Sequence, residues 1–431
     1  MSQVAVKKMD LLSMFFLSLN CIVGSGLFLL PGQVAAVCGN WGLVFYVVVA
    51  LMILALGWCY AMCSRLYTRN GGPYLYAKEA FGDFIGFEVG LIRCVVSSTA
   101  CASLTSGCVV ALGSLCPLLL ETPIKQCLII SLIGGLSLLN LFGTNVIKNL
   151  SNVITVSKLL LVICFIGFGL FAIQPEYLFA LADTPPIPSM AACSTAVLII
   201  FYAFNGFEVV SFIAAETDNP KRNIPIALMS GIICSSILYF IIQSICIGVL
   251  GDSLSSSASP IMDVAEAAGG GFAKLFVFIA MLISIGGVLV VSSFTTPRTF
   301  AALAQEQKIL LSLAKQNSYG APSLAIAFSM AITCVVALSG TFVELVTISV
   351  ISRFVQHIST TAALFAFEKK GMMQPFTAPW KRAIPIFALA SMVWLLSQAE
   401  GYQVICGLGV LVLGVPLYFI QKQWAAKELQ T

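Results

Sequence analysis

"NCIVGSGLFLLPG", residues 20–32, lies within an apolar run near the N-terminus and decides how the fold is interpreted. It places Gly24, Ser25 and Gly26 side by side at the centre of an otherwise helical segment. Glycine costs about 1 kcal/mol relative to alanine in a helix interior. The cluster therefore predicts either an interruption of the helix or a close contact between helices that pack through small residues.

A second interruption lies in the sequence FYAFNGFEVVSF, residues 201–212. Asn205 and Gly206 break the apolar run, and the acidic Glu208 follows within it. An acid at membrane depth is costly and is a candidate functional residue by default. Paired interruptions at corresponding positions of two halves are typical of transporters built from an inverted repeat.

The composition is that of a protein embedded in membrane lipid. Of the 431 residues, 59% are hydrophobic and only 9% are charged, whereas a soluble domain carries roughly 25% charged residues. No basic tract suits nucleic acid, and the 15 cysteines and the single histidine form no pattern typical of a metal site or a Ser-His-Asp triad. We therefore expect an integral membrane protein that is not an enzyme and needs no cofactor or metal.

A spanning helix needs about 20 mainly apolar residues. The chain offers twelve such segments in a single domain over residues 1–431: 11–36, 41–66, 84–115, 124–142, 152–172, 191–214, 225–250, 272–296, 322–340, 342–366, 381–398 and 401–421. With this division, most lysines and arginines fall on the side that carries both termini. The positive-inside rule then predicts a multi-pass protein of the cell (inner) membrane with both termini in the cytoplasm.

The two breaks offer complementary binding groups. The half-helix that resumes after a break presents free N–H groups and a partial positive charge, which favour a carboxylate. The preceding half exposes carbonyls, which favour an ammonium group. A break can therefore bind both poles of an α-amino acid, and the alternative is that the glycines only pack helices together. Glu208 either exchanges protons or forms a fixed ion pair that holds the unwound segment.

Three stretches carry a resemblance to a known family: VGSGLFLLPG at 23–32, FYAFNGFEVV at 201–210 and ETDNPKRNIPIA at 216–227. Together with the twelve segments, they make the whole chain similar to the amino acid–polyamine–organocation (APC) superfamily of transporters. The resemblance implies an all-α, LeuT-like fold with a 5+5 inverted repeat plus two C-terminal helices. Repeat one would cover about 11–172, repeat two about 191–366 and the extra helices about 381–421.

The resemblance also implies a substrate site at the two breaks. The substrate carboxylate would bind the amides of the glycine cluster, and the amine would bind carbonyls of both breaks, which together involve Ile22, Gly24, Ser25, Gly26, Tyr202, Ala203, Asn205 and Gly206. Tyr202 resembles the aromatic gate of the family, and the alternative is a packing residue. Lys158 matches a lysine whose ammonium replaces sodium, which implies sodium-independent transport; the alternative is a lysine that snorkels to the interface.

Within the superfamily, the chain is most similar to the bacterial basic amino acid/polyamine antiporters, but it departs from them in the pocket. Cys101 stands where the arginine/agmatine exchangers have an asparagine, and Val288 stands where they have a tryptophan. The loss of an aromatic platform removes a cation–π contact. A smaller or more apolar amino acid is therefore as reasonable a substrate as arginine, agmatine or a polyamine.

Arg93 and Arg353 lie within predicted helices, and Arg353 shares a helix face with the sole histidine, His357. We expect each arginine to face the bundle with an acidic or carbonyl partner, which the sequence does not identify, or to act in gating or proton coupling. We expect His357 to be a buried core residue.

The leading hypothesis is a secondary active transporter, a permease or antiporter, that moves amino acids by alternating access. Substrate exchange and proton coupling are both open as the driving process. The oligomeric state is open as well, with a homodimer among the alternatives. A channel, a membrane-embedded enzyme and a non-transporting sensor on a transporter fold are the competing classes.

Overall fold

The computed structural model describes residues 9–69, 71–113, 116–142, 144–179, 188–307, 311–374 and 378–428. Within these ranges the chain is helical, and its only strand-like pairing is an isolated bridge between Met9 and Thr217. The helical elements are α1 (Leu11–Ile22), α2 (Ser25–Cys38), η1 (Gly39–Trp41), α3 (Gly42–Ser64), α4 (Pro73–Phe81), α5 (Asp83–Gly113), η2 (Pro117–Leu120), α6 (Thr122–Leu141), α7 (Thr144–Ala172), α8 (Pro175–Phe179), α9 (Met190–Ala203), η4 (Phe207–Glu216), α10 (Pro220–Leu250), η5 (Gly251–Ser256), α11 (Pro260–Gln307), η6 (Leu311–Ala314), α12 (Ser323–Ser339), α13 (Phe342–Lys369), α14 (Pro379–Gln398) and α15 (Gly401–Glu428).

Many of these helices suit a bilayer. Within the described chain, eight helical segments are long and apolar enough to cross a membrane: Gly26–Ser64, Asp83–Gly113, Thr122–Leu141, Met190–Ala215, Pro220–Ser256, Pro260–Gln305, Phe342–Lys369 and Gly401–Ile420. Large apolar side chains also face outward, including Phe171, which is 95% exposed, and Phe272, which is 84% exposed. Soluble surfaces rarely carry extended apolar patches. The expected all-helical integral membrane protein is therefore confirmed, whereas twelve spans and a 5+5 repeat stay predictions.

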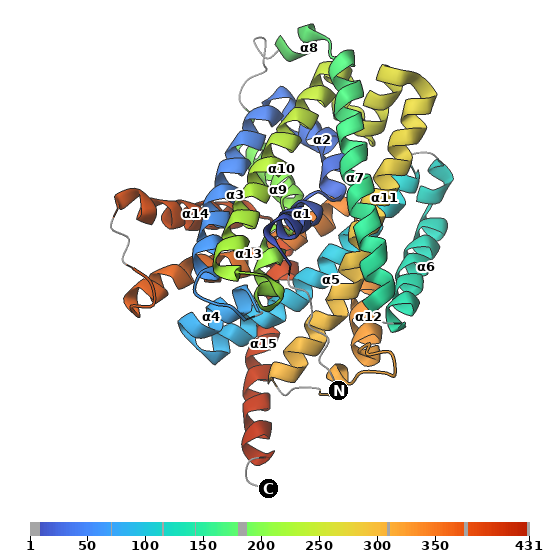
Figure 1. Ribbon diagram of the computed structural model, residues 1–431. Helices are drawn as coiled ribbons and strands as arrows, with labels where there is room; N and C mark the ends of the chain where they lie inside the picture. Colours follow the sequence, from blue (N-terminus) through green and yellow to red (C-terminus); the bar gives the residue numbers. More distant parts are fainter. Residues whose placement is uncertain are drawn as a thin grey trace.

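Figure 1 shows a bundle in which α1 and α2 lie near the centre. α1 packs against α10 and α2 packs against α9, while the long helices α5 and α11 pack against each other. The short helix α8 lies at one end of the bundle, and α4 and the C-terminal end of α15 lie at the other (Figure 1). We call these ends the α8 face and the α4 face.

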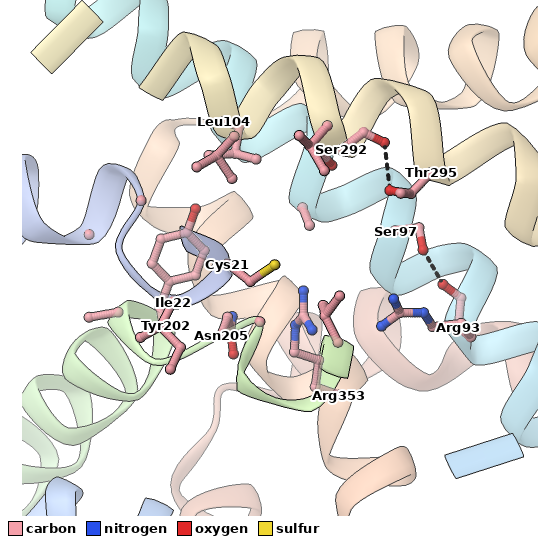
Figure 2. Close-up of a pocket in the computed structure, with 18 residues that line it drawn as sticks. Cys21, Ile22, Arg93, Ser97, Leu104, Tyr202, Asn205, Ser292, Thr295 and Arg353 are labelled. Carbon is pink, nitrogen blue, oxygen red and sulfur yellow. Dashed lines mark hydrogen bonds between the residues drawn. The ribbon is translucent and has the colours of Figure 1, made fainter. Parts of the chain in front are cut away.

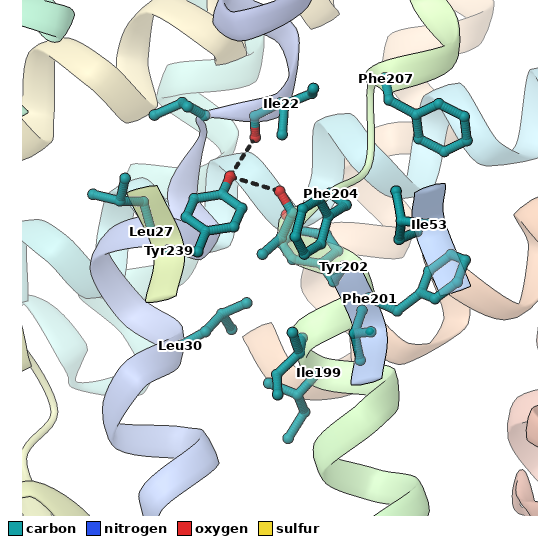
Figure 3. Packing of buried hydrophobic residues seen from close by; sticks show 14 of the residues in the cluster. Ile22, Leu27, Leu30, Ile53, Ile199, Phe201, Tyr202, Phe204, Phe207 and Tyr239 are labelled. Atoms are coloured by element: carbon teal, nitrogen blue, oxygen red, sulfur yellow. Dashed lines mark hydrogen bonds between the residues drawn. The ribbon is translucent and has the colours of Figure 1, made fainter. Parts of the chain in front are cut away.

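The centre of the bundle is packed closely around Tyr239 of α10. Its ring lies among buried apolar side chains from several helices, including Ile22, Leu27 and Phe204 (Figure 3). The ring of Phe204 meets that of Tyr239 edge to face, with centroids 5.1 Å apart. The core therefore surrounds both predicted breaks, one near residue 23 and the other near residue 205, and it fixes their positions.

Candidate functional site

The interruption predicted in the first apolar segment is confirmed. α1 ends at Ile22 and α2 begins at Ser25, with Val23 in an extended conformation between them. Val23 donates its N–H to the carbonyl of Leu19, 2.9 Å away, which completes α1. α2 starts with Gly24 as its N-cap and receives no side-chain cap from the described residues. The first N–H groups of α2 are therefore left without partners inside their own helix.

The second predicted interruption is confirmed as well. α9 ends at Ala203, and the chain turns through Phe204, Asn205 and Gly206 before η4 begins at Phe207. Gly206 has a φ of 107°, which residues with a side chain rarely adopt. η4 spans 10 residues of 3₁₀ helix with a kink at Ile213, so it consists of two shorter helical pieces, in keeping with the short length usual for 3₁₀ helices. The sequence predicts the break but not this change of helix type.

The two breaks touch each other through glycines. A Cβ atom on Gly26 would lie 2.8 Å from the Cα of Ala203, and one on Gly206 would lie 2.4 Å from the carbonyl oxygen of Cys21. Both distances are too short for a side chain. A Cβ on Gly24 would instead meet no neighbour closer than 3.9 Å. Packing therefore accounts for Gly26 and Gly206, whereas Gly24 needs another explanation.

Two buried polar side chains hold the ends of the broken helices. The hydroxyl of Tyr239 lies 2.9 Å from the carbonyl oxygen of Ile22 and 2.8 Å from that of Ala203 (Figure 3). It has one proton to donate, so the two carbonyls share it. Lys158 of α7 donates from Nζ to the carbonyl and the side-chain oxygen of Asn20, at 2.9 and 3.0 Å. Because Lys158 is only 1% exposed, it does not snorkel to the interface.

A cavity of about 140 Å³ opens beside the breaks (Figure 2). Roughly 10–15 Å³ admits one water molecule, so the cavity has room for a small solute. α5 contributes one helical face and α11 another, and the remaining walls come from the breaks, η4 and α13. The lining residues of the two long helices are Arg93, Ser97, Ala100 and Leu104 of α5 and Val288, Val291, Ser292 and Thr295 of α11.

Most of the predicted site residues lie at this cavity: Ile22, Gly24, Gly26, Tyr202, Ala203, Asn205, Gly206 and Val288. Cys101 is an exception, because the lining residue is its neighbour Ala100 and Cys101 is buried among the helices, so a substrate contact at Cys101 stays a prediction. Lys158 and Glu208 do not line the cavity either. Lys158 binds Asn20 near the end of α1, and Glu208 binds the backbone N–H of Gly206 in the second break. The side chain of Ser25 lies outside the described residues.

Tyr202 joins three helices at one end of the cavity. Its hydroxyl lies 3.0 Å from Oγ of Ser103 on α5. Its ring meets that of Phe342, the first residue of α13, edge to face with centroids 6.2 Å apart. These contacts fit a closed gate and equally fit a packing residue, so the gating role of Tyr202 stays a prediction.

Glu208 is the centre of a buried ion-pair cluster. Its Oε1 accepts a hydrogen bond from Nη1 of Arg353 on α13 and another from Nη1 of Arg93 on α5, 3.5 Å away. Its Oε2 accepts the backbone N–H of Gly206 at 3.0 Å. The acidic partner expected for both arginines is therefore Glu208. This is the geometry of a fixed ion pair, and proton exchange at Glu208 stays a prediction.

His357 is a buried core residue, as expected. It is 1% exposed, and its Nδ1 lies 2.8 Å from the hydroxyl of Tyr60. Its ring stacks on that of Phe207, with centroids 5.5 Å apart and an interplanar angle of 26°. His357 therefore supports the start of η4 and does not line the cavity.

One polar side chain at the cavity has no protein partner. Neither the oxygen nor the nitrogen of the Asn205 amide has a hydrogen-bond partner among the described residues. A buried polar group without a partner costs about 1–3 kcal/mol. Together with the uncapped N–H groups at the start of α2, Asn205 can bind a solute that has both donors and acceptors.

Tyr239, which bridges the two breaks, is a functional residue that the sequence does not single out. Its contacts with Ile22 and Ala203 join residues 217 and 36 positions apart. The available signal was a hydroxyl in the middle of an apolar segment, but tyrosine also packs in cores, so the signal is weak. Arg93 and Arg353 were found from their charge alone, because any unpaired charge in lipid is costly.

The chain matches the family described as Amino acid permease over residues 9–415. It is 28% identical over 449 residues to an uncharacterized transporter of Mycobacterium tuberculosis (strain H37Rv), covering 96% of this chain and 91% of the relative. It is 24% identical to the serine/threonine exchanger SteT of Bacillus subtilis (strain 168) and 23% identical to the putrescine transporter PotE of Escherichia coli (strain K12). Both alignments cover 97% of each chain.

Proposed function

Because the chain belongs to the amino acid permease family, whose members are transporters and not enzymes, we propose that it is a secondary active transporter that moves amino acids by alternating access. The observation that carries the proposal is the cavity formed where two broken helices meet. Broken helices at membrane depth are tolerated only where their free backbone groups are buried in protein or line a cavity. Such a site is typical of transporters and not of pores.

The helix contacts support a 5+5 inverted repeat. In such a repeat, a contact between two helices of different halves recurs between their counterparts. α1 packs against α10, and the counterparts of these helices, α9 and α3, also pack together. α7 packs against α11, and their counterparts, α13 and α5, do the same. We propose that α14 and α15 follow the repeat as additional spanning helices.

The substrate carboxylate binds the N–H groups at the start of α2, near Gly24 and Gly26. This helix end carries a partial positive charge and has no side-chain cap from the described residues. The ammonium group binds carbonyls of the breaks together with the amide oxygen of Asn205. The carbonyls of Ile22 and Ala203 already share the proton of Tyr239, but a carbonyl oxygen has a second lone pair to offer.

Transport is sodium-independent and proceeds by exchange. Nζ of Lys158 lies within 3.0 Å of both oxygens of Asn20, so a protein cation already neutralises the end of α1. Glu208 is held by two arginines and a backbone N–H, which supports a structural role over proton transfer. One of the relatives is itself an exchanger of serine and threonine. Proton-coupled transport is the alternative that the experiment below separates from exchange.

The α4 face is the cytoplasmic face of the inner membrane. Lys78, Arg69 and Lys370 gather around α4, where Lys370 donates to the carbonyl of Glu79 and Arg69 pairs with its carboxylate. Lysines and arginines are enriched in cytoplasmic loops. Because α15 ends on this face (Figure 1), the C-terminus is cytoplasmic. With an even number of crossings, the N-terminus is cytoplasmic too.

The experiment measures uptake of labelled amino acids and putrescine into sodium-free proteoliposomes that are either empty or preloaded with the same compound. Uptake that requires preloading supports exchange, and uptake driven by an inward proton gradient into empty vesicles supports proton coupling. A Cβ at Gly24 meets no atom closer than 3.9 Å, so Gly24→Leu places its side chain at the cavity and is expected to abolish uptake. Gly135→Leu, on an open face of α6, is the matched control. Equal uptake by both variants contradicts a substrate site at the breaks.

A further inference from the structure

Two guanidinium groups line the cavity, and a single carboxylate serves both. Arg93 and Arg353 line it, whereas Glu208, which pairs with both through the same Oε1, lies behind them. In Figure 2 the end of Arg353 lies below Cys21, and the end of Arg93 points toward it from the other side of the cavity. Two positive groups and one negative group leave an excess of one positive charge, and protonation of Glu208 would increase it. The cavity wall is therefore positive in either state.

The two arginines also keep donors that the protein does not use. A guanidinium group has five N–H donors. Nε of Arg353 has no hydrogen-bond partner among the described residues, although the side chain is only 8% exposed. Arg93 lies 3.5 Å from Glu208, which is long for a hydrogen bond between charged groups. The guanidinium carbon of Arg93 lies 4.3 Å from the centre of the Phe212 ring, which fixes its position without using a donor.

The arginines stand on the α4 side of the breaks at a distance that suits a short side chain. Arg93 precedes Ala100 by seven residues, or about 10.5 Å along α5. Both residues line the cavity, as does Gly24. The extended side chain of Arg93 covers part of this distance. The remainder accommodates an amino-acid side chain that ends in a polar group a few bonds from its α-carbon.

Resting on the function proposed above, we infer that the cavity selects amino acids with an acidic side chain of aspartate or glutamate size. The α-carboxylate and α-amine bind at the breaks, and the side-chain carboxylate binds the free donors of Arg93 and Arg353. A substrate with net charge −1 neutralises the excess positive charge of the wall. A neutral amino acid leaves the charge in place, and a dication such as putrescine adds to it.

The test compares near-isosteric pairs in counterflow: labelled glutamate against glutamine, and aspartate against asparagine, with serine and putrescine as references. We expect the acid of each pair to have an apparent KM at least about tenfold lower than its amide, which is the contribution of one hydrogen bond between charged groups. Arg93→Gln is expected to remove this preference by weakening transport of the acid alone, and Arg93→Lys to restore part of it. Arg93 is the better target because Arg353 is more deeply buried.

Arg382→Gln is the matched control, because it removes the same charge from an exposed position on α14. This variant should leave the ratio of the apparent KM of the acid to that of its amide unchanged. Equal transport of acid and amide, or a preference for putrescine, overturns the inference while the proposed transport function stands. An unchanged ratio in Arg93→Gln also overturns it. If no amino acid is exchanged by the wild-type protein, the proposed function fails and this inference fails with it.

Discussion

The sharpest prediction concerns Glu208, whose two suggested roles give different results in the variant Glu208→Gln. Glutamine has nearly the same volume, but it leaves the guanidinium groups of Arg353 and Arg93 without a counter-ion. Breaking a buried ion pair by changing one partner costs about 3–5 kcal/mol. The Arg93 contact spans 3.5 Å and that side chain is 18% exposed, so its share is small. We therefore expect the free energy of unfolding to fall by about 3 kcal/mol.

Equilibrium unfolding in mixed micelles measures this loss, followed by tryptophan fluorescence. A double-mutant cycle with Arg353→Gln isolates the pair, and the coupling energy is expected to reach about 2–3 kcal/mol. Glu344→Gln is the matched control, because Glu344 is the third residue of the capping box of α13, where glutamine can replace glutamate, and it is expected to cost less than about 1 kcal/mol. A Glu208→Gln protein that is as stable as the wild type but loses the pH dependence of transport would refute the structural role and establish proton exchange.

Three further predictions test the breaks. Tyr239→Phe removes the proton shared by two carbonyls and is expected to lower stability by about 1–2 kcal/mol and to weaken substrate binding, as measured by ligand-dependent thermal shifts; unchanged shifts contradict the bridge. Lys158→Met leaves the end of α1 without its cation and is expected to abolish exchange in sodium-free vesicles, whereas persistent exchange would exclude the sodium-like role. Gly206→Ala strains a φ of 107° and places Cβ 2.4 Å from the carbonyl of Cys21, so it is expected to destabilise by more than about 2 kcal/mol. Gly270→Ala, with a φ of 68° and no neighbour within 4 Å, is expected to lose only about 1 kcal/mol in the same unfolding assay.

The sequence predicted what depends on neighbours along the chain. Each of the twelve predicted segments contains helical residues, because apolar runs and loop residues are local signals. The two breaks were also predictable, since Gly24 and Gly206 stand out from the apolar residues around them. The predicted start at 225 is late because α10 begins at Pro220, where the fixed φ of proline suits the first turn of a helix.

The sequence did not predict what depends on distant pairs. Glu208 meets Arg93 across 115 residues and Arg353 across 145 residues. Lys158 meets Asn20 across 138 residues. No local sequence pattern predicts contacts between residues this far apart in the chain. The cost of a buried charge indicates that a partner exists, but only the packing of the helices identifies it.

The placement of Cys101 off the cavity wall has a geometric cause. The cavity-lining residues of α5 are Arg93, Ser97, Ala100 and Leu104, spaced by four, three and four positions. This is the spacing of one face of an α-helix. An assignment shifted by one residue turns the side chain about 100° around the axis. Matching a position to a family without gaps carries that risk.

The backbone groups freed at the two breaks show which part of the site is left for a solute. The carbonyls of Asn20, Ile22 and Ala203 are held by Lys158 and Tyr239. The N–H of Gly206 is held by Glu208, and that of Asn205 by the carbonyl of Tyr202.

Among the described residues that line the cavity, the buried side-chain groups without a hydrogen-bond partner are the amide of Asn205 and Nε of Arg353, and the start of α2 has no side-chain cap from the described residues. They surround one cavity and consist mostly of donors. Unsatisfied donors in a low-dielectric site bind an anion more strongly than in water. The unpaired N–H groups therefore favour a solute with at least one carboxylate. A polyamine, which has donors and no carboxylate, would leave these N–H groups without an acceptor.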